Sequence, residues 1–301
     1  MKPLSGILLL DKPLGISSAG MVRAVENRLR WYKVGHLGTL DPMASGLLVV
    51  MVGHAVKMMP YLLHGMKSYT ATIEFGKATD TYDREGTVVE EADVPTDLGE
   101  RLVSSLAGMT GRQMQVPPIF SAIKKDGKRL YELARKGKSV VPEAREVVIH
   151  NLTLQSFDGC QAVVEVRCSA GTYIRSLAVD LGTACGTVAF LAGLRRTEST
   201  PFRLSGDALS LEDVDRAKNL EDRLLPLESF DLPGQRHTLA GDEHLMVLRG
   251  TPLPFPPGFP GGPADHVFLL AANGELMAVG QVSPDASVLQ IKRVIRPDIE
   301  W

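Results

Sequence analysis

The chain has 301 residues, of which 44% are hydrophobic and 23% are charged, and its net charge is −2. This length and composition predict a folded protein with a full core, divided into two domains. No apolar run approaches the roughly 18 residues of a membrane-spanning helix. The short run at residues 7–10 is followed directly by Asp11 and Lys12, which is not typical of a signal peptide. We therefore expect a cytoplasmic protein with no membrane contact.

The N-terminal two thirds of the chain alternate between predicted strands and helices. Ser17 or Ser18 can cap a helix that runs to about Leu29, and residues 69–75 show the period-2 alternation of a half-buried strand. Two prolines forbid a helix at residues 115–122. The other segments are predicted strands at 6–10, 47–52, 147–156 and 161–168, and predicted helices at 95–108, 129–136 and 173–185.

A second unit begins near residues 232–234. After residue 234 the chain reads as a series of short strands, and Asn273-Gly274 is a strong signal for a hairpin turn. A segment rich in proline and glycine at residues 251–263 predicts a loop. The predicted strands of this unit are residues 243–248, 267–271, 276–282 and 288–295.

The order of these elements favours an α+β fold. Strands come in groups with helices between them and do not follow a regular βαβ order, which indicates a largely antiparallel sheet. No internal repeat is visible. The three cysteines form no CxxC pair and the histidines lack metal-ligand spacing, so we expect reduced thiols and no bound metal.

One acid, Asp41, stands in a segment built for a defined backbone shape. The run GHLGTLDPMASGLL at residues 35–48 has glycines at 35, 38 and 46, and Pro42 follows the acid. Glycine permits tight turns and proline restricts the residue before it, so Asp41 is predicted to lie on a stiff loop. Such a loop suits a catalytic acid. From spacing alone, an ordinary Asp-Pro turn is equally compatible with this segment.

Charge is unevenly distributed between residues 80 and 138. Acidic side chains dominate residues 80–97, whereas residues 124–138 carry seven cations and two acids. A basic window in a nearly neutral protein fits a surface that tracks nucleic-acid phosphates, although a solvated helix with ordinary lysines fits equally well. The first four cations of this window are Lys124, Lys125, Lys128 and Arg129.

Five blocks of sequence, in order, resemble the TruB family of RNA pseudouridine synthases. Residues 35–48 resemble the segment that carries the family's essential aspartate. The other matching blocks are LLLDKPLGISS at 8–18, KSY at 67–69, GTYIRSL at 171–177 and LAGLRRT at 191–197. The resemblance implies a mixed, mainly antiparallel central sheet with flanking helices. It assigns residues 1–231 to the catalytic domain, with an RNA-clamping insertion at about 121–145. The weaker match of residues 236–301 implies a small β-rich, PUA-like C-terminal domain.

The same resemblance implies roles for individual residues. Asp41 is the essential carboxylate, Arg175 its charge partner and Tyr69 the residue that stacks on the target base. His36 supports base flipping, whereas Tyr173 and Leu194 line the substrate pocket. Lys12 is predicted to contact a phosphate or the active-site loop, with a purely structural role equally compatible.

The implied reaction is the isomerisation of uridine at position 55, in the T-loop of tRNA, without a cofactor. The residues leave open whether Asp41 attacks the sugar, attacks the base or removes a ribose proton. A tRNA-binding or RNA-folding protein without chemistry is the alternative, disfavoured by the intact set Asp41, Tyr69 and Arg175. We expect a monomer whose partner is the tRNA T-arm, with no guide RNA. The basic window is expected to become ordered on tRNA.

Overall fold

The computed structural model describes residues 4–120, 142–254, 262 and 265–296, together with the backbone of 124–125 and 128–129. Its main feature is a nine-stranded mixed sheet with the strand path β1-β3-β12-β4-β11-β10-β7. All neighbouring pairs are antiparallel except β3 and β12, which run parallel. The strands are β1 (Ser5–Lys12), β2 (Val34–His36), β3 (Ala44–Gly53), β4 (Lys67–Phe75), β7 (Gly111–Gln115), β10 (Arg145–Phe157), β11 (Gln161–Cys168), β12 (Ala189–Ser199) and β13 (Phe202–Arg203). The predicted mixed, mainly antiparallel sheet is therefore confirmed.

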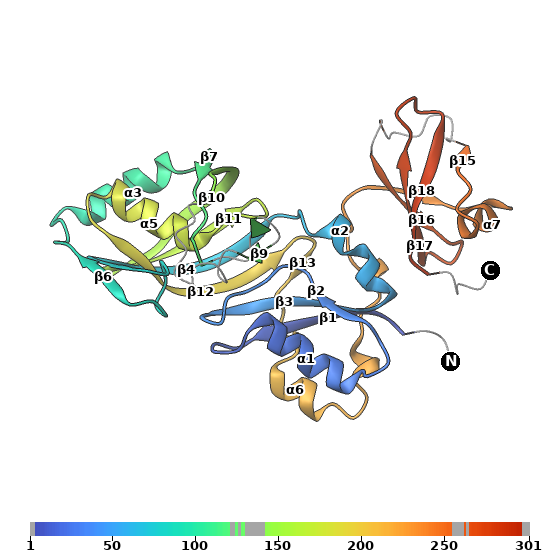
Figure 1. Ribbon diagram of the computed structural model, residues 1–301, viewed down its shortest axis with the longest axis horizontal. Coiled ribbons are helices and arrows are strands. Elements are labelled where there is room, and N and C mark those ends of the chain that lie inside the picture. The colour runs from blue at the N-terminus through green and yellow to red at the C-terminus, as the bar shows by residue number, and fades with distance from the viewer. Residues whose placement is uncertain are drawn as a thin grey trace.

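Helices cover this sheet in two groups (Figure 1). Helices α3 (Leu98–Gly108) and α5 (Ile174–Ala184) lie together over the β4, β10 and β11 region, and α1 (Ser18–Arg28) lies beside α6 (Leu211–Arg216) at the β1–β3 end. The hydroxyl of Ser17 caps α1 by accepting a hydrogen bond from Gly20 N at 3.0 Å. The remaining short helices of this part are η1 (His54–Met58), α2 (Met59–Leu62), η2 (Leu220–Arg223) and η3 (Leu227–Ser229).

Strand β3 is buried on both faces, which explains its continuous apolar run. Leu48, Val50 and Val52 pack with residues of α1 and α6, whereas Leu47, Val49 and Met51 face the opposite side. Because side chains alternate across a strand, an apolar residue at every position is needed when both faces are covered. This packing fixes the strand that begins three residues after Asp41.

Most predicted elements of this part are confirmed within one to three residues at each end. Helices α1, α3 and α5 and strands β1, β3, β4, β10 and β11 match the expected segments. Two short hairpins were not predicted, β5 (Lys77–Thr79) with β6 (Val88–Glu91) and β8 (Lys124–Lys125) with β9 (Lys128–Arg129). The helix predicted at 129–136 begins with a residue of β9, and its other residues lie outside the described part of the chain.

A separate five-stranded sheet lies at one end of the molecule (Figure 1). Its order is β14-β16-β17-β18-β15, and the expected hairpin at Asn273-Gly274 joins β16 to β17, with Gly274 at φ 83°. The strand predicted at 243–248 is wrong, because this segment is helix α7 (Glu243–Leu248). A six-residue apolar segment is too short to distinguish the period of a helix, about 3.6 residues, from the two-residue period of a strand. The strands are β14 (Gln235–Thr238), β15 (Leu253–Pro254), β16 (His266–Leu270), β17 (Leu276–Val282) and β18 (Val288–Val294).

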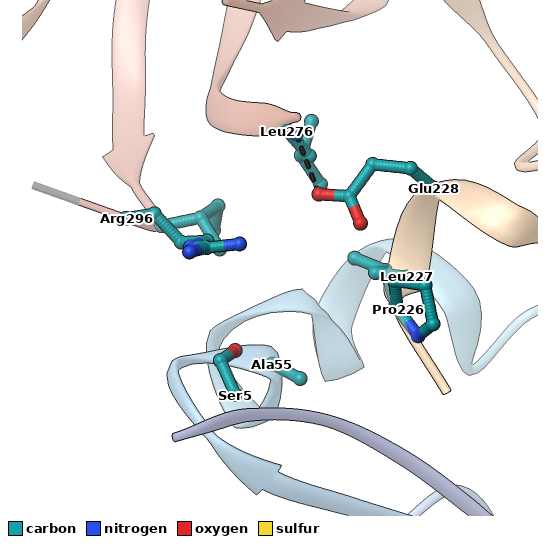
Figure 2. Close-up of a pocket in the computed structure, with 8 residues that line it drawn as sticks. Ser5, Ala55, Pro226, Leu227, Glu228, Leu276 and Arg296 are labelled. Carbon is teal, nitrogen blue, oxygen red and sulfur yellow. Dashed lines mark hydrogen bonds between the residues drawn. The ribbon is translucent and has the colours of Figure 1, made fainter. Parts of the chain in front are cut away.

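Polar and apolar contacts join the two sheets. Lys57 Nζ donates hydrogen bonds to the carbonyls of Val294 and Ile295, both at 3.0 Å. Figure 2 shows the junction, where the Glu228 carboxylate accepts a hydrogen bond from Leu276 N at 2.6 Å. Apolar side chains of β17 belong to the same cluster as the outer face of β3. The C-terminal sheet is thus joined to the segment that directly follows β3, since Lys57 belongs to η1 and Ala55 and Met58 of η1 lie in the same apolar cluster.

Candidate active site

Asp41 lies on a loop that is held by hydrogen bonds on both sides. The hydroxyl of Ser18 donates to Leu40 O at 2.9 Å and accepts from Leu40 N at 2.8 Å. On the other side, Pro42 O accepts from Gly15 N at 2.8 Å, and Ala44 N donates to Asp41 O at 3.1 Å. These contacts produce the stiff loop predicted from the sequence.

Lys12 also contacts this loop, from the interior. Its Nζ donates to the carbonyls of Pro13 at 2.9 Å, Ile16 at 2.7 Å and Pro42 at 3.5 Å. Burial lowers the pKa of Lys12 to about 8, and the nearby Asp41 charge opposes that change. An ammonium group on a residue that is 0% exposed offers no surface to an RNA phosphate. The geometry therefore fits a contact to the active-site loop and does not support the phosphate contact.

Arg175 joins Asp41 to a second acid, Asp83. Arg175 Nη2 lies 3.1 Å from Asp41 Oδ2, and Nη1 lies 3.4 Å from Asp83 Oδ2. The same guanidinium donates to Thr81 O at 3.2 Å and to Phe120 O at 2.9 Å. The arginine side chain is only 7% exposed, so the guanidinium itself is largely sheltered from water. A planar guanidinium held at four points is a rigid support for a carboxylate.

Asp83 is held as firmly as the arginine that it pairs with. Its Oδ1 accepts hydrogen bonds from Thr81 Oγ1 at 2.7 Å and from Glu85 N at 3.0 Å. Tyr82, between these residues, has a positive φ of 64°, which is uncommon for a non-glycine residue. The turn is fixed to β12, since Leu191 N donates to Tyr82 O at 3.0 Å. The sequence pattern places Asp83 only in an acidic stretch and does not predict its part in the site.

The two acids of this network differ in their access to solvent. The Asp83 side chain is 5% exposed, whereas that of Asp41 is 39% exposed. Burial raises the pKa of Asp41 above its ordinary value, the Arg175 charge lowers it, and Asp83 adds to the rise. Asp41 is therefore the carboxylate that a substrate can reach, and Asp83 is the one that anchors the arginine.

Tyr69 lies in β4 on the sheet face that carries the main apolar core. The residue is buried, and burial raises the pKa of its phenol to about 12. Arg196, directly opposite on β12, opposes that rise through its charge and a hydrogen bond to the phenol. Tyr69 is therefore a neutral phenol at physiological pH. The sequence block at 191–197 contains Arg196, but its pattern alone assigns this residue no role.

The residues predicted to contact the substrate come from β2, β12 and the N-terminus of α5. His36 ends β2, is half-buried and has no hydrogen-bond partner for Nδ1 among the described residues; burial lowers the pKa of its imidazole. Leu194 is half-buried on β12, opposite Ala71 of β4 and Ala44 of β3. Tyr173 precedes α5, and its ring lies under the Arg145 guanidinium at 4.7 Å from the ring centroid.

The predicted phosphate-binding side chains lie outside what the structure describes. For Lys124, Lys125, Lys128 and Arg129 only the backbone is described, as the β8–β9 pair.

Among the described residues, no group of three or more His, Cys, Asp or Glu side chains is arranged to hold a metal ion. In the same part of the chain, no helix has the length and apolar character needed to cross a membrane.

Comparison with known proteins identifies the family. The model of the TruB family pseudouridylate synthase N-terminal domain matches residues 26–174, and that of the tRNA pseudouridylate synthase B C-terminal domain matches residues 175–230. A tRNA pseudouridine synthase B of Chromohalobacter salexigens is 47% identical over 233 residues, covering 76% of this chain and 75% of the relative. The chain belongs to the TruB family.

A second TruB relative and two solved structures extend the comparison. A tRNA pseudouridine synthase B of Chromobacterium violaceum is 44% identical over 255 residues, covering 84% of this chain and 82% of the relative. A chain in the crystal structure of a Cbf5-Nop10-Gar1 complex matches with a TM-score of 0.75 and 25% identity, over 96% of this chain and 84% of that one. A chain in an H/ACA RNP bound to a substrate RNA containing 2'-deoxyuridine matches with a TM-score of 0.74 and 23% identity, over the same shares.

These matches confirm two predictions made from the sequence. The TruB resemblance of the five sequence blocks is confirmed, and so is the pseudouridine synthase fold. As a member of the TruB family, the protein is an enzyme, a pseudouridylate synthase. A purely RNA-binding protein without chemistry is accordingly the weaker interpretation.

Proposed function

We propose that this enzyme isomerises the uridine at position 55 of tRNA, in the T-loop, and that Asp41 is its essential catalytic group. The observation that carries the proposal is the contact between Arg175 and Asp41. Arg175 is buried and fixed, whereas Asp41 is open to a substrate. An ionised acid held in this way suits nucleophilic or acid-base chemistry on a nucleoside. The tRNA substrate is the one named for both curated relatives.

The reaction needs no group to be added to or lost from the product. The bond between ribose C1' and uracil N1 breaks, the base turns, and a bond forms between C1' and C5. The proton on C5 leaves and N1 gains one, so the product is an isomer. Asp41 would form a transient bond to the sugar or the base, or remove a ribose proton. In each route Arg175 keeps the carboxylate ionised and correctly oriented.

Tyr69 is proposed to stack on the target base close to C5. Its neutral phenol, with a pKa of about 12, is a poor base by itself. The adjacent Arg196 would stabilise the negative charge that forms if the hydroxyl takes part in removing the C5 proton. Stacking of the target base on the Tyr69 ring would also offset part of the free-energy cost of extruding that base from the RNA.

His36, Tyr173 and Leu194 are proposed to hold the extruded base and fill the gap that it leaves. His36 stands five residues before Asp41, and its half-buried ring has an unpaired Nδ1 among the described residues. Such an atom can hydrogen-bond to a nucleotide. Leu194 offers an apolar contact from the strand next to Tyr69. The phosphates of the T-arm are proposed to contact Lys124, Lys125, Lys128 and Arg129.

We also propose the organisation expected from the sequence. Residues 1–231, with the RNA-clamping insertion at 121–145, form the catalytic domain, and residues 236–301 form a PUA-like domain. The enzyme is proposed to act in the cytoplasm as a monomer, without a guide RNA or a cofactor. The contacts of the five-stranded sheet with Lys57 of η1 and with Glu228 support a C-terminal domain with a fixed orientation.

The experiment that tests the substrate is position mapping. Unmodified tRNA and an isolated T-arm stem-loop are incubated with the enzyme, and pseudouridine is mapped by nucleotide. Product at the T-loop uridine of both RNAs, without any added RNA, is the expected result. Product at another position, or only with an added guide RNA, would refute the proposed substrate. Tight binding without product would favour the alternative, an RNA-folding protein.

A further inference from the structure

Arg196 is the largest fully buried side chain among the described residues, with 1% of its surface exposed. No carboxylate pairs with it in this part of the chain. Burying a guanidinium without an ion pair carries a desolvation cost that a well-packed apolar side chain at the same place would not. Its presence therefore needs an explanation other than filling the core.

The hydrogen bonds of Arg196 reach both sides of the Asp41 loop. Nε donates to Leu47 O at 2.8 Å, and Nη2 donates to Gly38 O at 3.2 Å. Gly38 lies three residues before Asp41 and Leu47 lies six residues after it. Because the guanidinium is planar and rigid, it sets the spacing between these two carbonyls and so the shape of the loop between them.

The same side chain lies beside Tyr69. In the antiparallel pairing of β12 with β4, Arg196 stands directly opposite Tyr69, and opposite residues share one face of a sheet. On its other side, in the parallel pairing of β12 with β3, Arg196 stands opposite Gly46. A Cβ on Gly46 would lie 2.3 Å from Arg196 O, so only glycine permits this close approach. The backbone and the side chain of Arg196 are thus both fixed against the loop.

We propose that Arg196 is a positioning residue that holds the Asp41 loop and the Tyr69 ring at the separation that the reaction requires. This inference rests on the proposed catalytic roles of Asp41 and Tyr69. Arg196 touches neither Asp41 nor solvent, so it acts on the substrate only through the groups that it holds. Lysine cannot replace it, because one ammonium on a flexible stem cannot span the two carbonyls and the phenol as a planar fork does.

The test compares Arg196→Lys and Arg196→Met with the native enzyme and with Asp41→Asn. Arg195→Met is the matched control, since Arg195 is the neighbouring residue of β12, is 43% exposed and pairs with Asp11. For each protein the single-turnover rate on unmodified tRNA, the tRNA dissociation constant and the unfolding temperature are measured. The rate reports the geometry of the reacting groups, whereas the dissociation constant reports the RNA-binding surface.

We expect Arg196→Lys to lower the single-turnover rate at least 10-fold and Arg196→Met about 100-fold. The tRNA dissociation constants of both stay within threefold, and the rate of Arg195→Met falls less than threefold. If Arg196→Met does not fold, Arg196→Lys alone decides. A native rate for Arg196→Lys, or a parallel loss of rate and affinity, overturns the inference. Failure of the proposed function is seen separately, as activity retained by Asp41→Asn.

Discussion

Arg175 supports Asp41 from a position that does not depend on Asp41. The Nη2–Oδ2 distance between them is 3.1 Å, and the guanidinium is also bound to Asp83 and to the carbonyls of Thr81 and Phe120. Because Asp83 is buried and itself hydrogen-bonded, the arginine stays in place when Asp41 changes its charge or its partner. A catalytic carboxylate needs such support, since its charge and contacts change during the reaction.

The first prediction concerns Asp83→Asn. The amide keeps the shape but removes one charge, so the hold on Arg175 weakens and we expect a roughly 10-fold lower rate. Asp83 raises the pKa of Asp41, so its loss lowers that pKa and moves the acid limb of the pH–rate profile to lower pH. Single-turnover rates between pH 4.5 and 8 measure both effects. An acid limb that moves to higher pH would contradict this assignment.

The second prediction concerns the stability of Asp41→Asn. Burial raises the pKa of Asp41 in the folded state, so the folded protein binds the proton more tightly than the unfolded chain does. Stability is then lost as the pH rises from the unfolded pKa through the folded pKa. At pH 7 the ionised carboxylate costs stability, and Asp41→Asn is expected to be equally or more stable. The gain is below about 1 kcal/mol, because water screens a side chain that is 39% exposed.

Denaturant unfolding at pH 7 and at pH 4 measures this difference. We expect the advantage of Asp41→Asn at pH 7 to shrink at pH 4, where the native acid becomes protonated. Asp207→Asn, at an exposed loop position, is the control and changes neither value. A variant that is clearly less stable than the native protein at pH 7 would show that the Arg175 contact outweighs the burial of the acid.

A third prediction follows from the close approach at Gly46. The residue has φ 97°, and a Cβ there would lie 2.3 Å from Arg196 O. Gly46→Ala is therefore expected to destabilise the protein by more than about 2 kcal/mol and to lower activity, since both the conformation and the space exclude a side chain. Gly206→Ala is the control, because a Cβ there would have no atom within 4 Å and the φ of Gly206 is not in the left-handed region. Equal unfolding temperatures for the two variants would contradict the packing of β3 on β12.

The fourth prediction concerns the junction between the two sheets. Glu228→Leu removes the acceptor for Leu276 N, and leaving a buried donor unpaired costs about 1–3 kcal/mol. We expect faster amide hydrogen exchange in β17 and easier proteolysis near residues 231–235. Glu221→Gln, an exposed change in the same segment, leaves both unchanged. Unaltered exchange in β17 of Glu228→Leu would mean that this hydrogen bond does not hold the C-terminal sheet.

The sequence predicted the parts of this protein that local pattern determines. The Ser17 cap, the alternation in residues 69–75 and the apolar run at 47–52 each correspond to an observed element. The helix at Glu243–Leu248 was predicted as a strand because a short apolar segment fits either period, and one buried residue, Val247, is too little to show which face is covered.

The site was only partly predictable for a different reason. Asp41, Tyr69 and Arg175 were predicted as site residues through their motifs, whereas the proposed roles of Asp83 and Arg196 depend on the fold. Asp83 reaches Arg175 across 92 residues of sequence, and Arg196 meets Tyr69 only through the register of β12 with β4. Neither register nor long-range pairing can be deduced from the identity of a single charged residue in one sequence.

The central claim is that Asp41 performs the chemistry, and Asp41→Asn tests it most directly. Native enzyme and variant are incubated with unmodified tRNA under single-turnover conditions, and pseudouridine at the T-loop uridine is measured beside the tRNA dissociation constant. We predict product with the native enzyme, none with the variant, and dissociation constants within about threefold, because Arg175 stays anchored by Asp83. Equal product from the two proteins would contradict the account.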